Sequence, residues 1–330
     1  MLLHPSIIAL MTGSALTALM ILYAAYHGFL ILRHWDLSNG SELQLRLERR
    51  TYLISTIVGL ALVFQLASLF LYVYTVDSLC TLFTGAMCAA GTLNVNSYGY
   101  PALALKIANF LLAGVWLIVN FADNKAPDYP LIRAKYRILL ALAPLIAVEA
   151  GLLYAYFLGL EPDIITSCCG SLFSRDKAGL ASDLAAMPAA PMMAAFYAAI
   201  ALTFVSGIFY SWTGKGGYVF SAISAATSVI VLSSVFSFLS LYIYELPTHH
   251  CPFCILQAEY GRIGYPLYGA LLCAAVSGLG VGALMPFRNI ASLKHVVPAL
   301  QRRLCTTVLA CYAILAAIAT YKILTSNLVL

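Results

Sequence analysis

The chain has 330 residues, of which 62% are hydrophobic and 9% charged, and its formal net charge is +5. A soluble domain carries about 25% charged residues, so this composition excludes a soluble protein and indicates a polytopic membrane protein in contact with a lipid bilayer. The net charge does not predict a nucleic-acid partner, because the basic residues fall in a few short loops.

Apolar runs follow one another along the chain, and each is long enough to cross a bilayer, which takes roughly 20 residues. The first run is too long for a signal peptide, and no Lys or Arg precedes it. The sequence therefore predicts an all-α membrane bundle of about eight transmembrane helices. The predicted spans are residues 6–33, 52–76, 101–122, 138–160, 190–212, 219–244, 263–287 and 305–326.

The tripeptide Gly-Tyr-Pro opens the third and the seventh span, and Pro101 and Pro266 are 165 residues apart. This spacing is half of the chain and predicts two four-helix halves in a parallel repeat. The first half is 1–165 with the loop of Cys80 and Cys88, the second is 190–330, and the loop 166–189 joins them. The alternative is that Gly-Tyr-Pro is ordinary punctuation at the membrane interface, where tyrosine is common.

Basic residues alternate between the loops. The loops after spans 1, 3, 5 and 7 hold 13 Lys and Arg residues, whereas residues 77–100 and 245–254 hold none and residues 161–189 hold only Arg175 and Lys177. By the positive-inside rule the first set is cytoplasmic. We therefore expect a bacterial inner-membrane protein with both termini and all three cysteine-containing loops on the periplasmic side.

Six of the nine cysteines fall in these three outer loops, two in each. Disulfides form and persist in the oxidising periplasm, so the pairs indicate redox chemistry, metal binding or structural disulfides. The other three cysteines lie in or at the ends of spans and are expected to be small apolar fillers. The outer pairs are Cys80 with Cys88, Cys168 with Cys169, and Cys251 with Cys254.

The pairs differ in their expected chemistry. Cys251-x-x-Cys254 is predicted to open a helix, where free backbone N–H groups and the helix dipole favour a reactive thiolate. Adjacent Cys168 and Cys169 would form a strained, easily reduced disulfide, or two thiolates for a soft metal. The pair Cys80 and Cys88 flanks Gly85, so the loop can fold back into a disulfide.

The stretch "CPFCILQAEYGRIGYPL" resembles the C-x-x-C-x-x-Gln-Arg segment of the DsbB-type disulfide-forming membrane proteins, with Cys251, Cys254 and Gln257 at the matching positions. The family's arginine falls at Ala258. Arg262 lies one helical turn further on the same expected face and is the candidate for its role. In that family a dithiol at the periplasmic end of a helix passes electrons to a bound quinone.

A second stretch, "CTLFTGAMC" followed by "NSYGYPALAL", resembles the outer loop of vitamin K epoxide reductase-type proteins. The matching positions are Cys80, Cys88, Ser97 and Pro101. Both families use a four-helix bundle, a C-x-x-C, a shuttle pair of loop cysteines and a quinone. The two likenesses cover about 50 residues of this chain.

The resemblance implies a membrane thiol–disulfide oxidoreductase. A periplasmic thioredoxin-like or other thiol protein reduces an outer disulfide, Cys80–Cys88 or Cys168–Cys169. Exchange passes the electrons to the pair Cys251 and Cys254, and from there to ubiquinone or menaquinone. Catalysis would then lie with these six cysteines.

Several polar residues are candidates for the quinone site. His249, His250 and Arg262 would steady negative charge on a quinone oxygen, and Gln257 follows from the resemblance. Lys106 and Glu149 lie inside predicted spans, where charges are costly and are either functional or paired. They would deliver protons, or they would form a structural ion pair with each other.

Two other classes of function remain open. His249, His250, Cys251 and Cys254 form a nitrogen and sulfur ligand set for copper, mercury or zinc, in a soft-metal binding or transport protein. Alternatively, the chain is a non-enzymatic subunit of a larger respiratory or secretion complex, with disulfide-stapled loops. Covalent haem is not expected, because attachment requires C-x-x-C-H and Ile255 follows Cys254.

Overall fold

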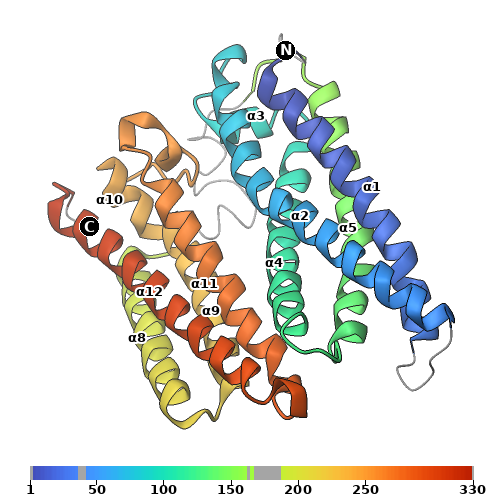
Figure 1. The fold of residues 1–330 in the computed structure, drawn as a ribbon. Helices are drawn as coiled ribbons and strands as arrows, with labels where there is room; N and C mark the ends of the chain where they lie inside the picture. Colours follow the sequence, from blue (N-terminus) through green and yellow to red (C-terminus); the bar gives the residue numbers. More distant parts are fainter. Residues whose placement is uncertain (1–2, 36–41, 162–163, 167–186, 329–330) are drawn as a thin grey trace. The chain divides into compact units, whose positions relative to one another are not determined.

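The computed structural model describes residues 3–35, 42–161, 164–166 and 187–328, which are α-helical without strands. Eight of their helices are long and apolar enough to cross a membrane (Figure 1). The prediction of an all-α, multi-pass helical bundle is therefore confirmed. The spans are Pro5–His34, Gln44–Leu82, Gly99–Asp123, Ile132–Leu158, Ala189–Thr213, Gly217–Tyr244, Gly264–Phe287 and Val296–Thr325.

Two helices begin well before their predicted spans. Helix α2 (Glu42–Ser78) and helix α12 (Val296–Thr325) start about ten residues earlier than hydropathy indicates. The added turns carry charged residues such as Arg46 and Arg302 among good helix formers. Arginine has a high helix propensity, although its insertion into the hydrocarbon core of the bilayer is unfavourable. The helices therefore extend past the apolar runs.

The chain divides into two compact units. Unit 1 contains Met1–Thr75, Asn96–Leu160 and Pro286–Val297, and unit 2 contains Val76–Val95, Glu161–Met285 and Pro298–Leu330. The loop of Cys80 and Cys88 thus belongs to unit 2, although the sequence analysis grouped it with the first four spans. It shares that unit with Cys251 and Cys254.

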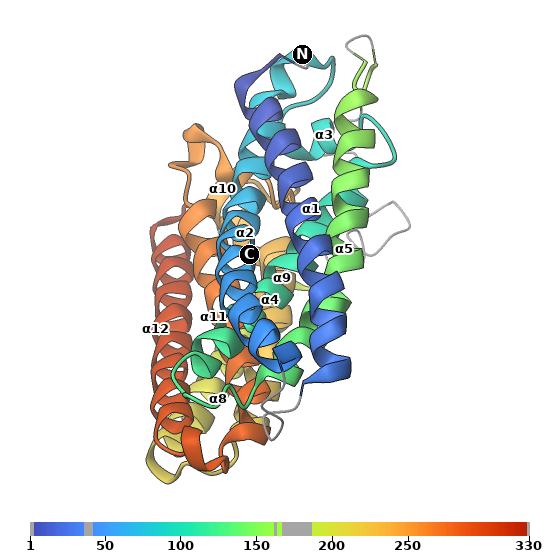
Figure 2. The ribbon, with the colours of Figure 1, turned by 45° about the vertical axis from the view of Figure 1, so that its right-hand side comes forward.

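Unit 1 is built from α1 (Pro5–His34), most of α2, α4 (Gly99–Asp123) and α5 (Ile132–Leu158). Helix α5 packs against both α1 and α4 (Figures 1 and 2). Their buried faces form one apolar core around Trp116 and Leu139, both fully buried.

Unit 2 is built from α8 (Ala189–Thr213), α9 (Gly217–Ser234), α10 (Ser240–Tyr244), α11 (Gly264–Leu284) and most of α12. Helix α9 packs against α8 and α11. The contact with α11 is close because a Cβ at Gly278 would lie 2.3 Å from Ser224 Oγ, and one at Gly282 would lie 2.4 Å from Ser221 Oγ. Small residues at this spacing allow close helix packing in membranes.

The sixth span is not a uniform α-helix. A π-helical segment, η2 (Val235–Leu239), separates α9 from α10 within one continuous span. Such widened turns inside α-helices are rare and occur frequently at functional sites. In this segment the carbonyl of Phe236 accepts a hydrogen bond from the side chain of His250, which lies outside the helix.

The expectation that Cys251-x-x-Cys254 opens a helix is wrong. The segment forms two 3-10 turns, η3 (Cys254–Leu256) and η4 (Ala258–Tyr260), and α11 begins only at Gly264. Gly261 and Arg262 between them have φ angles of 65° and 53°. This left-handed conformation interrupts a helix, so Arg262 does not share a helical face with Ala258, as was expected.

Both Gly-Tyr-Pro motifs open a helix, as predicted: Gly99 is the first residue of α4 and Gly264 the first of α11. The proline falls at the third residue of each helix, in the first turn, where its missing N–H is tolerated. In α11 the glycine is also required sterically, because a Cβ there would lie 3.0 Å or less from Ile255 and Leu256.

Candidate functional site

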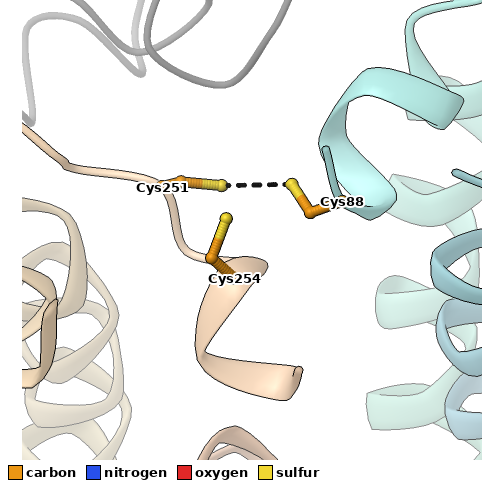
Figure 3. Close-up of side chains that lie close together, drawn as sticks. All are labelled: Cys88, Cys251 and Cys254. Carbon is orange, nitrogen blue, oxygen red and sulfur yellow. Dashed lines mark hydrogen bonds between the residues drawn. The ribbon is translucent and has the colours of Figure 1, made fainter. Parts of the chain in front are cut away.

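Three cysteines of unit 2 converge (Figure 3). The sulfur atoms of Cys88, Cys251 and Cys254 all lie within 4.8 Å of one another, and the Cys88 and Cys251 sulfurs are 3.6 Å apart. All three side chains are buried, with exposed fractions of 0%, 1% and 4%. Cys88 comes from the first cysteine-containing loop, and Cys251 and Cys254 come from the third, more than 160 residues further along the chain. These three residues are called the thiol cluster below.

The first loop holds Cys88 by local hydrogen bonds. Cys88 is extended (φ −159°) and directly precedes the short helix α3 (Ala89–Leu93). The carboxylate of Asp77 accepts a hydrogen bond from the backbone N–H of Ala89 at 3.0 Å. The turn after Cys88 is therefore anchored to the end of the second span.

Thr166 anchors the same loop from a distant part of unit 2. Its hydroxyl donates to the carbonyl of Gly91 at 2.8 Å, and its N–H donates to the carbonyl of Thr84 at 3.0 Å. Gly85 has a φ of 88°, and a Cβ there would lie 2.3 Å from the Thr166 carbonyl oxygen. Only glycine satisfies both the left-handed backbone and this close approach.

The Cys251–Cys254 turn is held by phenols. The hydroxyl of Tyr244 donates to the carbonyl of Cys251, and the hydroxyl of Tyr268 donates to the carbonyl of Pro252 at 2.6 Å. These tyrosines lie on α10 and α11, so the turn is fixed to two spans. Neither tyrosine was predicted as a site residue, because tyrosines at the membrane interface are too common for their role to be read from the sequence.

Gln257 connects the two loops. Its side-chain N–H donates to the carbonyl of Met87 at 2.6 Å, next to Cys88. The resemblance assigned Gln257 to the quinone, whereas here its amide joins the C-x-x-C turn to the Cys88 loop. Arg262, the other candidate of this segment, is exposed.

His250 is buried, and its Nδ1 lies 2.8 Å from the carbonyl oxygen of Phe236 in the π segment. A carbonyl only accepts, so Nδ1 carries the proton, and in the neutral ring Nε2 is the basic nitrogen. The ring of His249 packs edge-on against Tyr244 with centroids 4.5 Å apart. Neither imidazole belongs to the thiol cluster, whose members are cysteines alone among the described residues.

Tyr260 stands beside the turn on η4. Burial, and then the neighbouring Cys254, Glu259 and Cys251, raise the pKa of its phenol. The phenol therefore stays neutral at physiological pH and keeps a proton to donate. Its ring packs against Tyr244 with centroids 4.6 Å apart.

None of the other described cysteines is a member of the cluster. Cys80 begins the 3-10 turn η1 (Cys80–Leu82) and is half-buried, outside the group of mutually close sulfurs. Cys168 and Cys169 lie outside the residues that the structure describes. Of the three cysteines expected to be small apolar fillers, Cys305 and Cys311 are buried, whereas Cys273 is exposed on α11.

Lys106 and Glu149 meet in unit 1. Lys106 Nζ lies 2.7 Å from Glu149 Oε1 and 3.0 Å from Ser68 Oγ, and both charged side chains are buried. The second carboxylate oxygen accepts from Asn109 at 2.6 Å and from Gln65. This geometry fits the structural ion pair that the sequence analysis left open beside proton delivery.

A second buried ion pair was missed. Lys135 Nζ lies 2.7 Å from Asp123 Oδ2, and both side chains are fully buried. The other carboxylate oxygen accepts from the N–H of Leu131 at 2.8 Å. Lys135 precedes the predicted span 138–160 and was expected in a loop, so the signal for the pair was the opposite charges at each side of a short turn.

Comparisons with protein-family models, with curated proteins and with solved structures find no match to this chain. The chemistry of the thiol cluster therefore carries the functional argument. Three adjacent sulfurs permit thiol–disulfide exchange when two of them are oxidised. When all three are reduced, they offer a soft-metal ligand set.

Proposed function

We propose that this chain is an integral membrane thiol–disulfide oxidoreductase that passes electrons between cysteine pairs and a membrane quinone. The single observation that carries the proposal is the 3.6 Å separation of the Cys88 and Cys251 sulfurs. A disulfide bond is about 2.05 Å long, so an approach of about 1.5 Å forms a mixed disulfide between the two loops. Cys254 is close enough to act as the resolving thiol.

The exchange balances within the cluster and one further thiol. A Cys88 thiolate attacks Cys251 of an oxidised Cys251–Cys254 pair, forms the Cys88–Cys251 bond and releases Cys254 as a thiolate. A second thiol, Cys80 of the same loop or one from a partner protein, then attacks Cys88. This step releases Cys251, so two electrons and two protons have moved onto the C-x-x-C pair.

A quinone would take these two electrons and two protons and restore the Cys251–Cys254 disulfide. The surroundings suit a flat, apolar head group, because the thiol pair belongs to an apolar cluster against which Phe253 and Tyr260 pack. Tyr260 and the neighbouring imidazoles of His249 and His250 would hold it by hydrogen bonds. Gln257 and Arg262 are weaker candidates for binding the quinone. The side-chain amide of Gln257 already donates to the carbonyl of Met87, and the side chain of Arg262 is exposed.

The proposal places both termini and the cysteine-containing loops on the periplasmic side of a bacterial inner membrane, on the basis of the alternation of basic loops. A thioredoxin-like or other thiol protein would meet the loop of Cys80 and Cys88 there. Leu82 and Met87 of this loop are exposed, at 48% and 66%, and offer an apolar contact close to the cysteines.

The test is to trap the mixed disulfide. In a Cys254→Ser variant the resolving thiol is absent, so oxidation by a soluble quinone analogue should accumulate a Cys88–Cys251 bond. Proteolysis and mass spectrometry without reductant would detect it as a linked peptide pair. The matched control is Cys305→Ser, a buried cysteine outside the cluster, which should respond to quinone as the unaltered protein does.

Two results would contradict the proposal. Cysteines that remain oxidised and indifferent to quinone and quinol would favour a non-enzymatic subunit whose loops are stapled. A linked pair that forms equally with Cys254 present and absent would show that Cys254 resolves nothing.

A further inference from the structure

The thiol cluster has a second chemistry that does not depend on electron transfer. Its members are three cysteines from two loops, and no imidazole or carboxylate of the described residues joins them within 4.8 Å. The sequence alone offers a mixed nitrogen and sulfur set of His249, His250, Cys251 and Cys254. The structure replaces the two histidines by Cys88, so the ligand set becomes sulfur alone.

The spacing of the sulfurs matches a small coordination sphere. With metal–sulfur bonds of about 2.3 Å, three ligands in a trigonal plane stand about 4.0 Å apart. The observed separations are 3.6 Å for Cys88 and Cys251 and no more than 4.8 Å for any pair. These separations are compatible with three sulfurs around one metal ion.

Burial limits the coordination number. None of the three side chains is more than 4% exposed, so a fourth ligand from bulk water is disfavoured. Thiolates bind both zinc and soft ions such as Cu(I), but structural zinc sites are almost always four-coordinate. A dry, three-sulfur set therefore favours Cu(I) over Zn(II).

The backbone around the cluster is already fixed. The carbonyls of Cys251 and Pro252 accept from Tyr244 and Tyr268, and Gln257 joins the turn to Met87. Outer partners that orient the ligands of a metal are part of its binding site. Binding would thus require little reorganisation of either loop.

We propose that Cys88, Cys251 and Cys254, when reduced, bind one Cu(I) ion through three sulfur ligands. Each thiol that becomes a thiolate ligand releases one proton to the medium, and no electron is transferred. An ion held in this way also keeps the three cysteines from forming disulfides. Copper would therefore block the exchange proposed above, but its binding does not require that exchange.

The experiment uses the full-length protein in detergent, reduced and without oxygen. Cu(I) is titrated in competition with a chromophoric Cu(I) chelator, and the affinities of Cys88→Ser, Cys251→Ser and Cys254→Ser are compared with that of Cys305→Ser. Loss of an outer-shell partner alone costs about 10–100-fold in affinity. We expect more than about a hundredfold loss for each cluster variant and no change for Cys305→Ser.

X-ray absorption on the unaltered protein tests the site without any substitution. Three sulfur neighbours at about 2.3 Å support the proposal. Two sulfurs would overturn it. It would also be overturned by cluster variants that bind Cu(I) as the unaltered protein does, or by a protein that retains Zn(II) in preference to Cu(I).

The two proposals fail separately. The mixed-disulfide experiment is run with a chelator and no copper, and the titration is run with no quinone. A trapped Cys88–Cys251 bond without copper binding would support the oxidoreductase proposal and contradict the Cu(I) site. Copper binding at the cluster without a trapped Cys88–Cys251 bond would support the Cu(I) site and contradict the oxidoreductase proposal.

Discussion

The two units bury different kinds of polar groups. Among the described residues, every buried Asp, Glu and Lys belongs to unit 1, where the four form the pairs Lys106–Glu149 and Asp123–Lys135. The buried polar side chains of unit 2 are hydroxyls, amides, His250 and, beside them, the thiol cluster. Unit 1 thus compensates charge with charge, while unit 2 keeps its interior neutral.

The difference indicates that the buried polar groups of unit 1 are structural, whereas those of unit 2 can take part in a reaction. A buried charge must keep its partner, because an uncompensated ion costs several kcal/mol, so the pairs of unit 1 resist rearrangement. Thiols and hydroxyls can stay neutral and lose less when they change partner. The neutral interior of unit 2 is accordingly the one suited to exchange bonds or to accept a metal.

The largest effect is expected in unit 1. Glu149→Leu leaves Lys106 buried without its carboxylate and should lower the free energy of unfolding by about 3–5 kcal/mol. The double variant Lys106→Met with Glu149→Leu removes both charges and should be more stable than the single variant. Unfolding by detergent titration measures both. A double variant as unstable as the sum of the two single variants would break the interpretation of a charge-compensated interior.

The close packing of unit 2 comes next. Gly278→Ala places a Cβ 2.3 Å from Ser224 Oγ, and such overpacking should cost about 1–3 kcal/mol. Gly269→Ala on the same helix is the matched control, because a Cβ there meets nothing within 4 Å and alanine is the better helix former. Equal stabilities of the two variants would show that α9 and α11 are not in close contact.

A smaller effect is expected at the thiol cluster. Tyr244→Phe removes the hydroxyl that donates to the Cys251 carbonyl, which should cost about 1 kcal/mol. It should also speed alkylation of Cys251 in the reduced protein, because the turn loses one of its anchors. Tyr218→Phe is the control, since that tyrosine is exposed. Unchanged alkylation of Cys251 would mean that the phenol does not position the turn.

The smallest change in the free energy of unfolding is expected for an exposed ion pair, which tests the contrast with the buried pairs of unit 1. Arg46 pairs with Glu42 on the exposed surface of α2. Arg46→Gln should change the free energy of unfolding by at most about 0.5 kcal/mol, because water and salt screen such pairs. A loss comparable to that of Glu149→Leu would show that exposure does not separate the two pairs.

The sequence by itself determined the number, position and class of the spans. Hydropathy and length report the transfer of each segment into the bilayer, which depends on local composition, and all eight spans follow from it. The sequence also identified Cys88, Cys251 and Cys254 as residues of interest, together with the possible pairing of Lys106 and Glu149. These conclusions need no knowledge of which loops touch.

Only the tertiary structure decided which cysteines meet. Cys88 lies beside Cys251 because Asp77, Thr166 and Gln257 fix two distant loops through hydrogen bonds to backbone groups. Such bonds depend on the path of the backbone and leave no periodic pattern in the sequence. The helix expected at Cys251 failed for a similar reason, since the left-handed residues Gly261 and Arg262 end the turn before α11 begins.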